Sequence, residues 1–355
     1  MLQFLIFTAG IVIVATTLLS VTRVLLVPRS APDSLVRMVF LATRFFFRPW
    51  TNSTRPYAER DRIMAFYAPL SLLALLPAWL ALILLAYTGM FWALGVPSWR
   101  EAFRESGSSL LTLGFSPADT VSQTLLMFSE AAIGLILVAL LIAYLPTMYA
   151  AFSRREAAVT LLEVRAGSPP SAVEMIERYH RIHGLERLSQ VWPAWEAWFA
   201  EIEESHTSLP ALVFFRSPQP DRSWVTAAGA VLDAAALTAT TLSIPHDASA
   251  DLCIRAGFIA LRRVADFFQF RYNPNPHFPE DPISITRLEF DAIYDRLASK
   301  GIPLKPDRDQ AWLDFAGWRV NYDPVLLALA DLTMAPPAPW SSDRSQGRGS
   351  GKLQA

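Results

Sequence analysis

Cysteine and lysine are both scarce in this chain of 355 residues. Cys253 is the single cysteine, so no disulfide can form within the chain and a cysteine-based metal site is excluded. Lysine occurs only at positions 300, 305 and 352, and arginine supplies the other basic side chains. The net charge is −1, which gives no reason to expect nucleic acid as a partner.

Charged residues are absent from two long stretches and almost absent from a third. None occurs in residues 2–22 or 63–99, and Glu130 is the only one in residues 121–152. A helix needs about 20 apolar residues to cross a hydrocarbon layer of ~30 Å. The sequence therefore predicts an all-α membrane protein with three transmembrane helices. The first, residues 1–27, reads as a retained anchor and not a cleaved signal peptide, because Arg23 follows the apolar run instead of preceding it.

The basic residues between these stretches predict an orientation. Eight arginines lie between the first two apolar stretches and are opposed by three acidic residues, and Arg154, Arg155 and Arg165 follow the third stretch. Short loops rich in arginine stay on the cytoplasmic side of a membrane. We therefore expect a multi-pass protein of the cell inner (plasma) membrane, with its N-terminus outside and its C-terminal part in the cytoplasm.

Residues 31–50 have the pattern of an amphipathic helix at the membrane interface. Arg37, Arg44 and Arg48 recur at spacings of seven and four, so they share one helix face, with apolar side chains beside them. Such a helix lies in the interface, with its arginines at anionic lipid headgroups. The alternative is a helix that packs on the C-terminal domain.

Residues 97–120 lie between the second and third apolar stretches, on the outer side by the charge argument. Pro97 and Ser98 are a plausible start for a short helix that reaches about Leu111. A turn rich in small residues follows. A short helix and an irregular turn between two spans are typical of a re-entrant loop, because irregular backbone at membrane depth must line a cavity or be buried in protein.

The residues of this turn carry a family resemblance. Thr112, Leu113, Gly114, Phe115 and Ser116 resemble the T-V-G-Y-G selectivity filter of tetrameric potassium channels, with Thr112 on the threonine, Gly114 on the first glycine and Phe115 on the aromatic position. The resemblance covers roughly residues 31–152. It implies a pore module of residues 63–152, a homotetramer, and potassium or other monovalent cations as permeant ions, with no cofactor and no metal beyond those cations.

One position departs from the family pattern. Ser116 stands where these channels have their second glycine. If that position needs a positive φ angle, serine is strained there. The outer ion site is then altered or lost, and a weakly selective cation pathway follows. Asp119 near the outer mouth would attract cations, although it lies two residues late for the acidic residue that often follows the filter.

Three residues of the third span are candidates for the pore or its gate. Glu130 is an ionisable group within a span, so it either lines the ion path, bonds behind the filter, or serves as a structural partner for Ser109, Thr112 or Ser129. Gly134 matches a hinge glycine of these channels or allows close helix packing. Pro146 bends the helix at a gate or is a plain kink.

The C-terminal part shows no alternating strand pattern and predicts a helical cytoplasmic domain over residues 153–334. Proline-rich breaks separate its helices, and the apolar stretch 224–243 reads as a buried helix in preference to a fourth span. Residues 335–355 are rich in proline, serine and glycine, which predicts a disordered tail.

The sequence contains no recognisable catalytic or nucleotide-binding motif, so we expect that the protein is not an enzyme. Glu177, His180 and His183 have a spacing that could place metal ligands on one helix face, but solvent-facing residues explain it better. The sequence thus predicts an ion channel for cation transport. The alternative is a non-conducting membrane receptor or scaffold with a helical cytoplasmic interaction domain.

Overall fold

The computed structural model describes residues 1–27, 33–52, 54–117 and 119–344. Within these ranges the chain is helical and contains no strand, only one isolated bridge between Leu242 and Leu304. Contacts divide the chain into two units. The apolar unit consists of Met1–Asn52 and Ile63–Ala150, and the C-terminal unit consists of Ser53–Arg62 and the chain from Ala151 onward.

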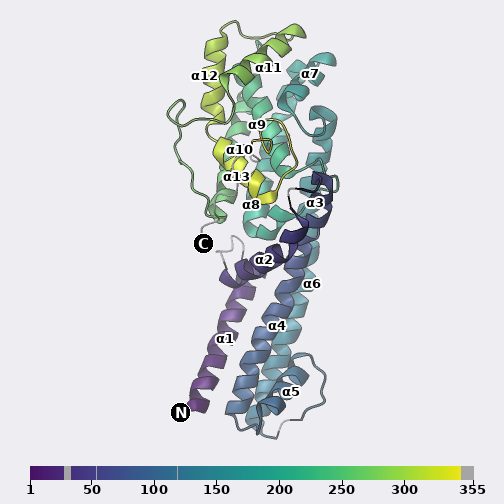
Figure 1. Ribbon diagram of the computed structural model, residues 1–355, viewed down its shortest axis with the longest axis vertical. Helices are drawn as coiled ribbons and strands as arrows, with labels where there is room; N and C mark the ends of the chain where they lie inside the picture. The colour runs from purple at the N-terminus through teal and green to yellow at the C-terminus, as the bar shows by residue number, and fades with distance from the viewer. Residues whose placement is uncertain (28–32, 53, 118, 345–355) are drawn as a thin grey trace. The chain divides into compact units, whose positions relative to one another are not determined.

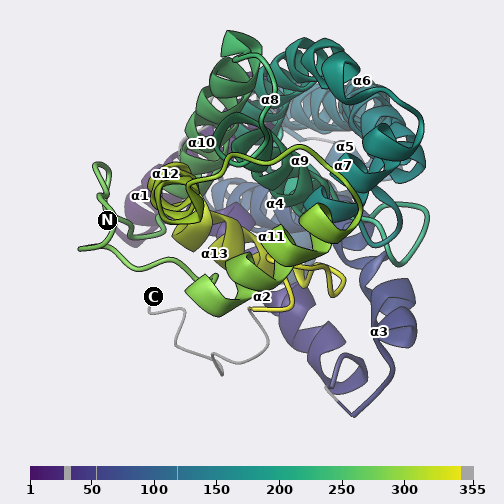
Figure 2. The same cartoon turned by 90° about the horizontal axis from the view of Figure 1, so that it is seen from above.

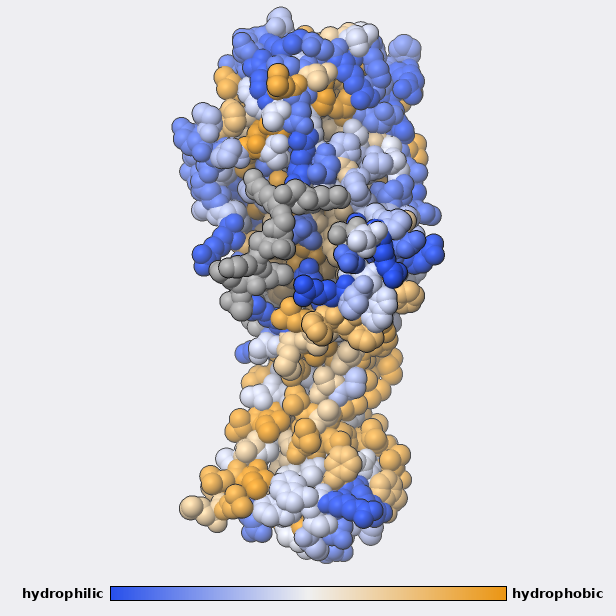
Figure 3. All heavy atoms as spheres, viewed as in Figure 1, coloured by the Kyte–Doolittle hydropathy of each residue, from blue (hydrophilic) through white to orange (hydrophobic). Residues whose placement is uncertain are grey.

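Three helices are long and apolar enough to cross a membrane, which confirms this part of the sequence prediction. They are α1 (Leu2–Leu25), α4 (Tyr67–Ala93) and α6 (Val121–Ala166). The short helix α3 (Tyr57–Met64) precedes α4. Hydrophobic residues cover most of the visible face of these helices (Figure 3). Exposed aliphatic side chains such as Leu85, Leu135 and Ile142 need an apolar environment, since burying them removes their contact with water.

The apolar unit is built by α1 packing along α4 (Figure 1). Gly10 permits this contact, because a Cβ atom there would lie 2.5 Å from the Cγ of Met90. The indole of Trp79 donates to the Ser20 hydroxyl at 3.3 Å, and that hydroxyl donates to Asp33 at 3.0 Å. Asp33 also caps the next helix, α2, so the helix pair and the start of α2 are linked by one chain of hydrogen bonds.

Helix α2 (Ser34–Phe47) continues as the short 3₁₀ helix η1 (Arg48–Trp50). Its buried side includes Phe47, and Phe40 contacts Tyr67 of α4 edge to face at 6.0 Å. Its other side exposes a row of large apolar side chains: Met38, Leu41, Phe45, Phe46 and Trp50. Arg37 and Arg48 are exposed and Arg44 is half-buried. The helix thus presents apolar and basic groups together, as its sequence pattern predicts.

The C-terminal unit surrounds one helix that is buried along its whole length. This helix, α9 (Trp224–Thr240), is rich in alanine, which allows its neighbours to approach closely. Helices α7, α10, α12 and α13 pack against it (Figure 2). The apolar stretch at 224–243 is therefore a core helix.

The other elements of the unit follow the chain around this centre. They are α7 (Ala172–Arg181), η2 (Leu185–Gln190), α8 (Trp192–Ser208), η3 (Pro210–Phe214), α10 (Ala248–Phe267), α11 (Arg287–Ser299), α12 (Arg308–Arg319) and α13 (Asp323–Thr333).

Helix α3 joins the C-terminal unit through Arg216. The guanidinium of Arg216 donates to Asp61 at 2.7 Å and to the Tyr57 hydroxyl at 2.9 Å. It also donates to the carbonyl oxygens of Thr333 at 2.7 Å and Met334 at 3.0 Å. Tyr57 donates to the same Met334 carbonyl. Arg216 therefore ties the segment before α4 to the end of α13, and we call these five residues the α3 clamp.

Residues 335–344 differ from the disordered tail that composition predicts. Trp340 is buried and its ring lies 5.6 Å from that of Phe315. Its carbonyl accepts a hydrogen bond from Arg319 at 2.5 Å. Burial of one large aromatic side chain and satisfaction of a buried guanidinium outweigh the composition of the segment. Residues 345–355 of the predicted tail lie outside the described residues.

Candidate functional site

The segment between the second and third apolar helices begins with the predicted short helix. Helix α5 (Trp99–Leu110) starts at Ser98, whose hydroxyl accepts from the Glu101 N–H at 3.2 Å. Trp92 and Trp99 stack at 5.0 Å across the preceding turn, where Gly95 has a φ of +97°. α5 packs on α4 and lies at the same end of the apolar unit as the N-terminus (Figure 1).

Serine hydroxyls hold α5 against its neighbours. The Ser106 hydroxyl lies 2.6 Å from Oε1 of Glu130 on α6 and 3.1 Å from the carbonyl of Leu84 on α4. The Ser109 hydroxyl donates to the carbonyl of Met127 on α6 at 2.6 Å. Both serines are buried. The short helix is thus fixed on two sides by hydroxyl groups.

The backbone of residues 112–116 turns its N–H groups toward the end of α5. Two of them bond the α5 backbone, Thr112 to the Ser109 carbonyl at 3.0 Å and Leu113 to the Ser108 carbonyl at 2.8 Å. Two more bond the Ser108 hydroxyl, from Phe115 at 3.0 Å and Ser116 at 3.2 Å.

This bonding fixes the direction of four carbonyl groups. In a planar trans peptide the C=O points opposite to the following N–H. The carbonyls that precede the four bonded N–H groups therefore point away from α5, and they belong to Leu111, Thr112, Gly114 and Phe115. A row of outward carbonyls on one short segment is an arrangement that can replace water around a cation.

Two alternating residues of this segment have positive φ angles, +54° at Thr112 and +70° at Gly114. Glycine adopts this region freely, whereas for a β-branched residue it is an outlier. Thr112 is the left-handed residue that ends α5, since the N–H groups of Thr112 and Leu113 bond the carbonyls of the last helical turn. Ser116, the residue in place of the second glycine, does not have a positive φ, so the strain expected there is absent.

The side chains of the segment are largely open in the single chain. Leu113 is 59% exposed and Phe115 is 52% exposed, with the guanidinium of Arg104 5.8 Å from the Phe115 ring centre. Asp119 is exposed as well, and its N–H donates to the Gln123 side chain at 3.0 Å. Within the described residues of its own chain, the segment leaves large apolar groups uncovered.

Glu130 lies behind α5. It is fully buried, one carboxyl oxygen accepts from Ser106, and Oε2 has no hydrogen-bond partner among the described residues. Beside it, the Tyr87 and Ser129 hydroxyls lie 2.9 Å apart. The partner Ser106 was not among those the sequence suggested. The bond joins α6 to α5 and does not involve residues 112–116.

Gly134 and Pro146 both lie inside the uninterrupted helix α6. A Cβ atom on Gly134 would lie only 2.5 Å from the Leu110 carbonyl oxygen at the end of α5. Close packing therefore gives a sufficient reason for this glycine. Pro146 is exposed, and the helix continues past it to Ala166.

The residues that sequence reasoning missed are Ser106 and Ser108. The signal was present, since Ser106, Ser108 and Ser109 crowd the last turn before Thr112. Because serine is common in polar turns, the run by itself does not reveal that these hydroxyls face inward.

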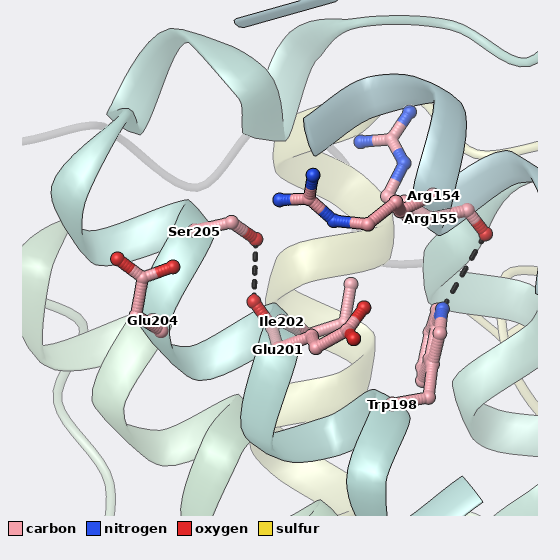
Figure 4. A pocket seen from close by; sticks show the side chains of 7 residues that line it. All are labelled: Arg154, Arg155, Trp198, Glu201, Ile202, Glu204 and Ser205. Carbon is pink, nitrogen blue, oxygen red and sulfur yellow. Dashed lines mark hydrogen bonds between the residues drawn. The ribbon is translucent and has the colours of Figure 1, made fainter. Parts of the chain in front are cut away.

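A pocket of about 80 Å³ lies in the C-terminal unit, between the end of α6 and α8 (Figure 4). It is lined by Arg154, Arg155, Trp198, Glu201, Ile202, Glu204 and Ser205. The Arg155 guanidinium donates to the carbonyls of Leu212 and Phe215, at 2.8 and 2.7 Å. These bonds fix the end of α6 in the unit, so the guanidinium is not available for a ligand.

The spacing of Glu177, His180 and His183 does not form a metal site. Glu177 is buried and bonds Arg296 and Lys300, both at 2.5 Å, so it is an ion-pair partner and not the solvent-facing residue that we expected. The described ranges contain no group of three or more His, Cys, Asp or Glu side chains that could hold a metal.

Comparison of the chain with known protein families, curated proteins and solved structures gives no significant match.

Proposed function

We propose that this chain is the subunit of a cation channel that conducts potassium, with residues 112–116 as its selectivity filter. The observation that carries the proposal is the pair of carbonyl groups, on Gly114 and Phe115, that are directed away from α5 because the following N–H groups bond the Ser108 hydroxyl. A dehydrated cation needs such oxygens around it.

The pore requires several copies of the chain. One loop can offer carbonyls to only one side of an ion, so a homotetramer with four loops around an axis completes the coordination. The exposed side chains of Leu113 and Phe115 would be covered by the neighbouring copies. Residues 97–120 would then be the re-entrant segment, with α4 and α6 as its flanking spans.

The membrane orientation completes the proposal. The N-terminus and α5 lie on the outer side, and the C-terminal unit lies in the cytoplasm, as the arginine distribution indicates. Helix α2 lies at the inner interface, where Arg37, Arg44 and Arg48 contact anionic headgroups while the exposed Phe45 and Phe46 enter the acyl layer. In this proposal the protein conducts ions and catalyses no reaction.

Two measurements test this proposal. The mass of the purified protein in detergent should correspond to four chains, and a monomer or dimer would overturn the pore. Liposomes that contain the protein should then pass potassium, measured with a potassium-sensitive dye under an imposed gradient. A stable tetramer that stays closed under every gradient would favour the receptor or scaffold function.

Gly114→Ala provides the site-specific test, with Gly95→Ala as a matched control. Both glycines have positive φ angles and open space around the Cβ position, so both substitutions add similar backbone strain. Only Gly114 lies in the filter. Potassium flux should be lost in Gly114→Ala and retained in Gly95→Ala, and equal flux in the two variants would refute the filter assignment.

A further inference from the structure

The filter segment contains only one glycine, yet its outer half has a defined backbone. The residue in the second glycine position is Ser116, which does not adopt a positive φ. A glycine there would let the backbone choose its own carbonyl direction. Some other group must therefore set the direction of the outermost carbonyls in this chain.

The Ser108 hydroxyl is that group. Its oxygen accepts from the N–H groups of two successive residues, Phe115 at 3.0 Å and Ser116 at 3.2 Å. A hydroxyl oxygen has two lone pairs and can accept both. These bonds fix the carbonyls of Gly114 and Phe115, whereas the carbonyls of Leu111 and Thr112 are fixed by the α5 backbone alone.

Burial makes this hydroxyl effective. Ser108 is only 1% exposed, so water does not compete for the two N–H groups. A hydrogen bond in such a low-dielectric position is stronger than one in water, and leaving its donors unpaired is costly. Ser108 is in turn held rigidly, because its neighbours Ser106 and Ser109 tie α5 to α6.

We propose that Ser108 is the positioning residue that determines the ion selectivity of the pore. This inference rests on the proposed function and deepens it. The hydroxyl replaces the second glycine by fixing the outer two carbonyl rings from behind. Selectivity between potassium and sodium, which depends on the positions of these oxygens, then depends on a side chain outside the filter.

The test compares Ser108→Ala, Ser108→Thr and Ser109→Ala in the full-length tetramer. Ser109 lies on the same turn of α5, but its hydroxyl bonds α6 and does not contact the filter segment, so it is the matched control. Potassium and sodium affinities are measured by calorimetry in detergent, a readout that does not require an open gate. The permeability ratio is measured from reversal potentials in bilayers.

In Ser108→Ala the preference for potassium should fall by about tenfold, roughly the effect of losing one buried hydrogen bond. Ser108→Thr keeps the hydroxyl and should retain the preference, and Ser109→Ala should match the unsubstituted protein. If Ser108→Ala does not assemble, Ser108→Cys carries the test, because a thiol of similar size is a weak acceptor. It should show a smaller loss in the same direction.

The outcomes separate this inference from the proposed function. A conducting or ion-binding tetramer in which Ser108→Ala and Ser108→Cys keep the full potassium preference would overturn the role of Ser108 alone. A Ser109→Ala variant that loses as much preference as Ser108→Ala would also overturn it, since general disturbance of α5 would explain both. A tetramer that binds neither ion would overturn the inference and the proposed function together.

Discussion

The two units satisfy their buried polar groups in different ways. Every ion pair between side chains in the described ranges lies in the C-terminal unit. The apolar unit relies on hydroxyl groups, as at Ser106, Ser108 and Ser109, and the more deeply buried of its two buried carboxyls in the described ranges, Glu130, bonds a serine. Charges are expensive in an apolar surrounding unless they are paired, whereas a hydroxyl can link helices at little cost.

The largest expected effect is in the C-terminal unit, at Arg319. Its fully buried guanidinium bonds Asp233, Asp323 at 2.7 Å and the Trp340 carbonyl. Arg319→Met leaves two buried carboxylates without their cation and should lower the free energy of unfolding by about 3–5 kcal/mol. Denaturant titration followed by tryptophan fluorescence measures this change.

Arg308→Met is the control for this substitution. Arg308 pairs with Asp295 at the surface, so its loss should change the free energy of unfolding by no more than about 1 kcal/mol. Similar losses in the two variants would show that burial does not decide the strength of the ion pairs, and the contrast between the units would fail.

An intermediate effect is expected in the apolar unit, at Gly134. A Cβ atom there would lie 2.5 Å from the Leu110 carbonyl, so Gly134→Ala should separate α5 from α6 and destabilise the protein by about 1–3 kcal/mol. Thermal unfolding in detergent measures the change. Gly107→Ala is the control, because its nearest neighbour, Leu84 Cδ1, is at 3.8 Å. A Gly134→Ala variant as stable as Gly107→Ala would argue against close packing as the reason for the glycine.

The smallest expected effect concerns Glu177 and depends on pH. Burial alone would raise the pKa of Glu177, but hydrogen bonds and charges of Arg296 and Lys300 outweigh it and hold the pKa below the usual value of 4.5. A depressed pKa stabilises the folded state above the unfolded pKa, and this stabilisation is lost as pH falls through the folded pKa.

Glu177→Gln should therefore reduce stability at pH 6 by no more than about 1 kcal/mol, because both cationic partners are partly exposed. The difference from the unsubstituted protein should shrink below pH 4.5. Unfolding titrations at several pH values measure it, with the exposed Glu186→Gln as the control. A difference that stays constant with pH would contradict the ion-pair role.

The three apolar helices and the start of α5 were predictable because their signals are local. Charge-free stretches mark the long apolar helices, and Ser98 marks the start of α5. The continuation of the third span as far as Ala166 follows from an unbroken helical pattern after Pro146. The direction of the carbonyl groups in the filter segment could be expected only from the resemblance to potassium channels. The residue types of a segment do not by themselves specify which way its peptide groups point.

Other features depend on contacts between distant residues and could not be predicted. The sequence cannot tell that Glu130 meets Ser106, because both residues have several equivalent candidates nearby. Pro324 is a local signal for the start of α13, but the sequence does not show that the turn before it places Tyr322 against Asp233, at 2.8 Å. The composition of the segment at Trp340 gives no sign that it is ordered, because the residues that it contacts lie elsewhere in the chain.

The α3 clamp also sets the order in which the protein can be completed during synthesis. Tyr57 and Asp61 are made before α4 and α6, yet Arg216 follows Asp61 by 155 residues and Met334 follows Tyr57 by 277. Contacts between such distant residues form late, after the long intervening chain has been closed into a loop. Helix α3 therefore lacks its bonds to Arg216 while α4 and α6 are synthesised. A nascent chain that stops before Thr333 would have all three apolar helices and still lack the carbonyls that Arg216 binds.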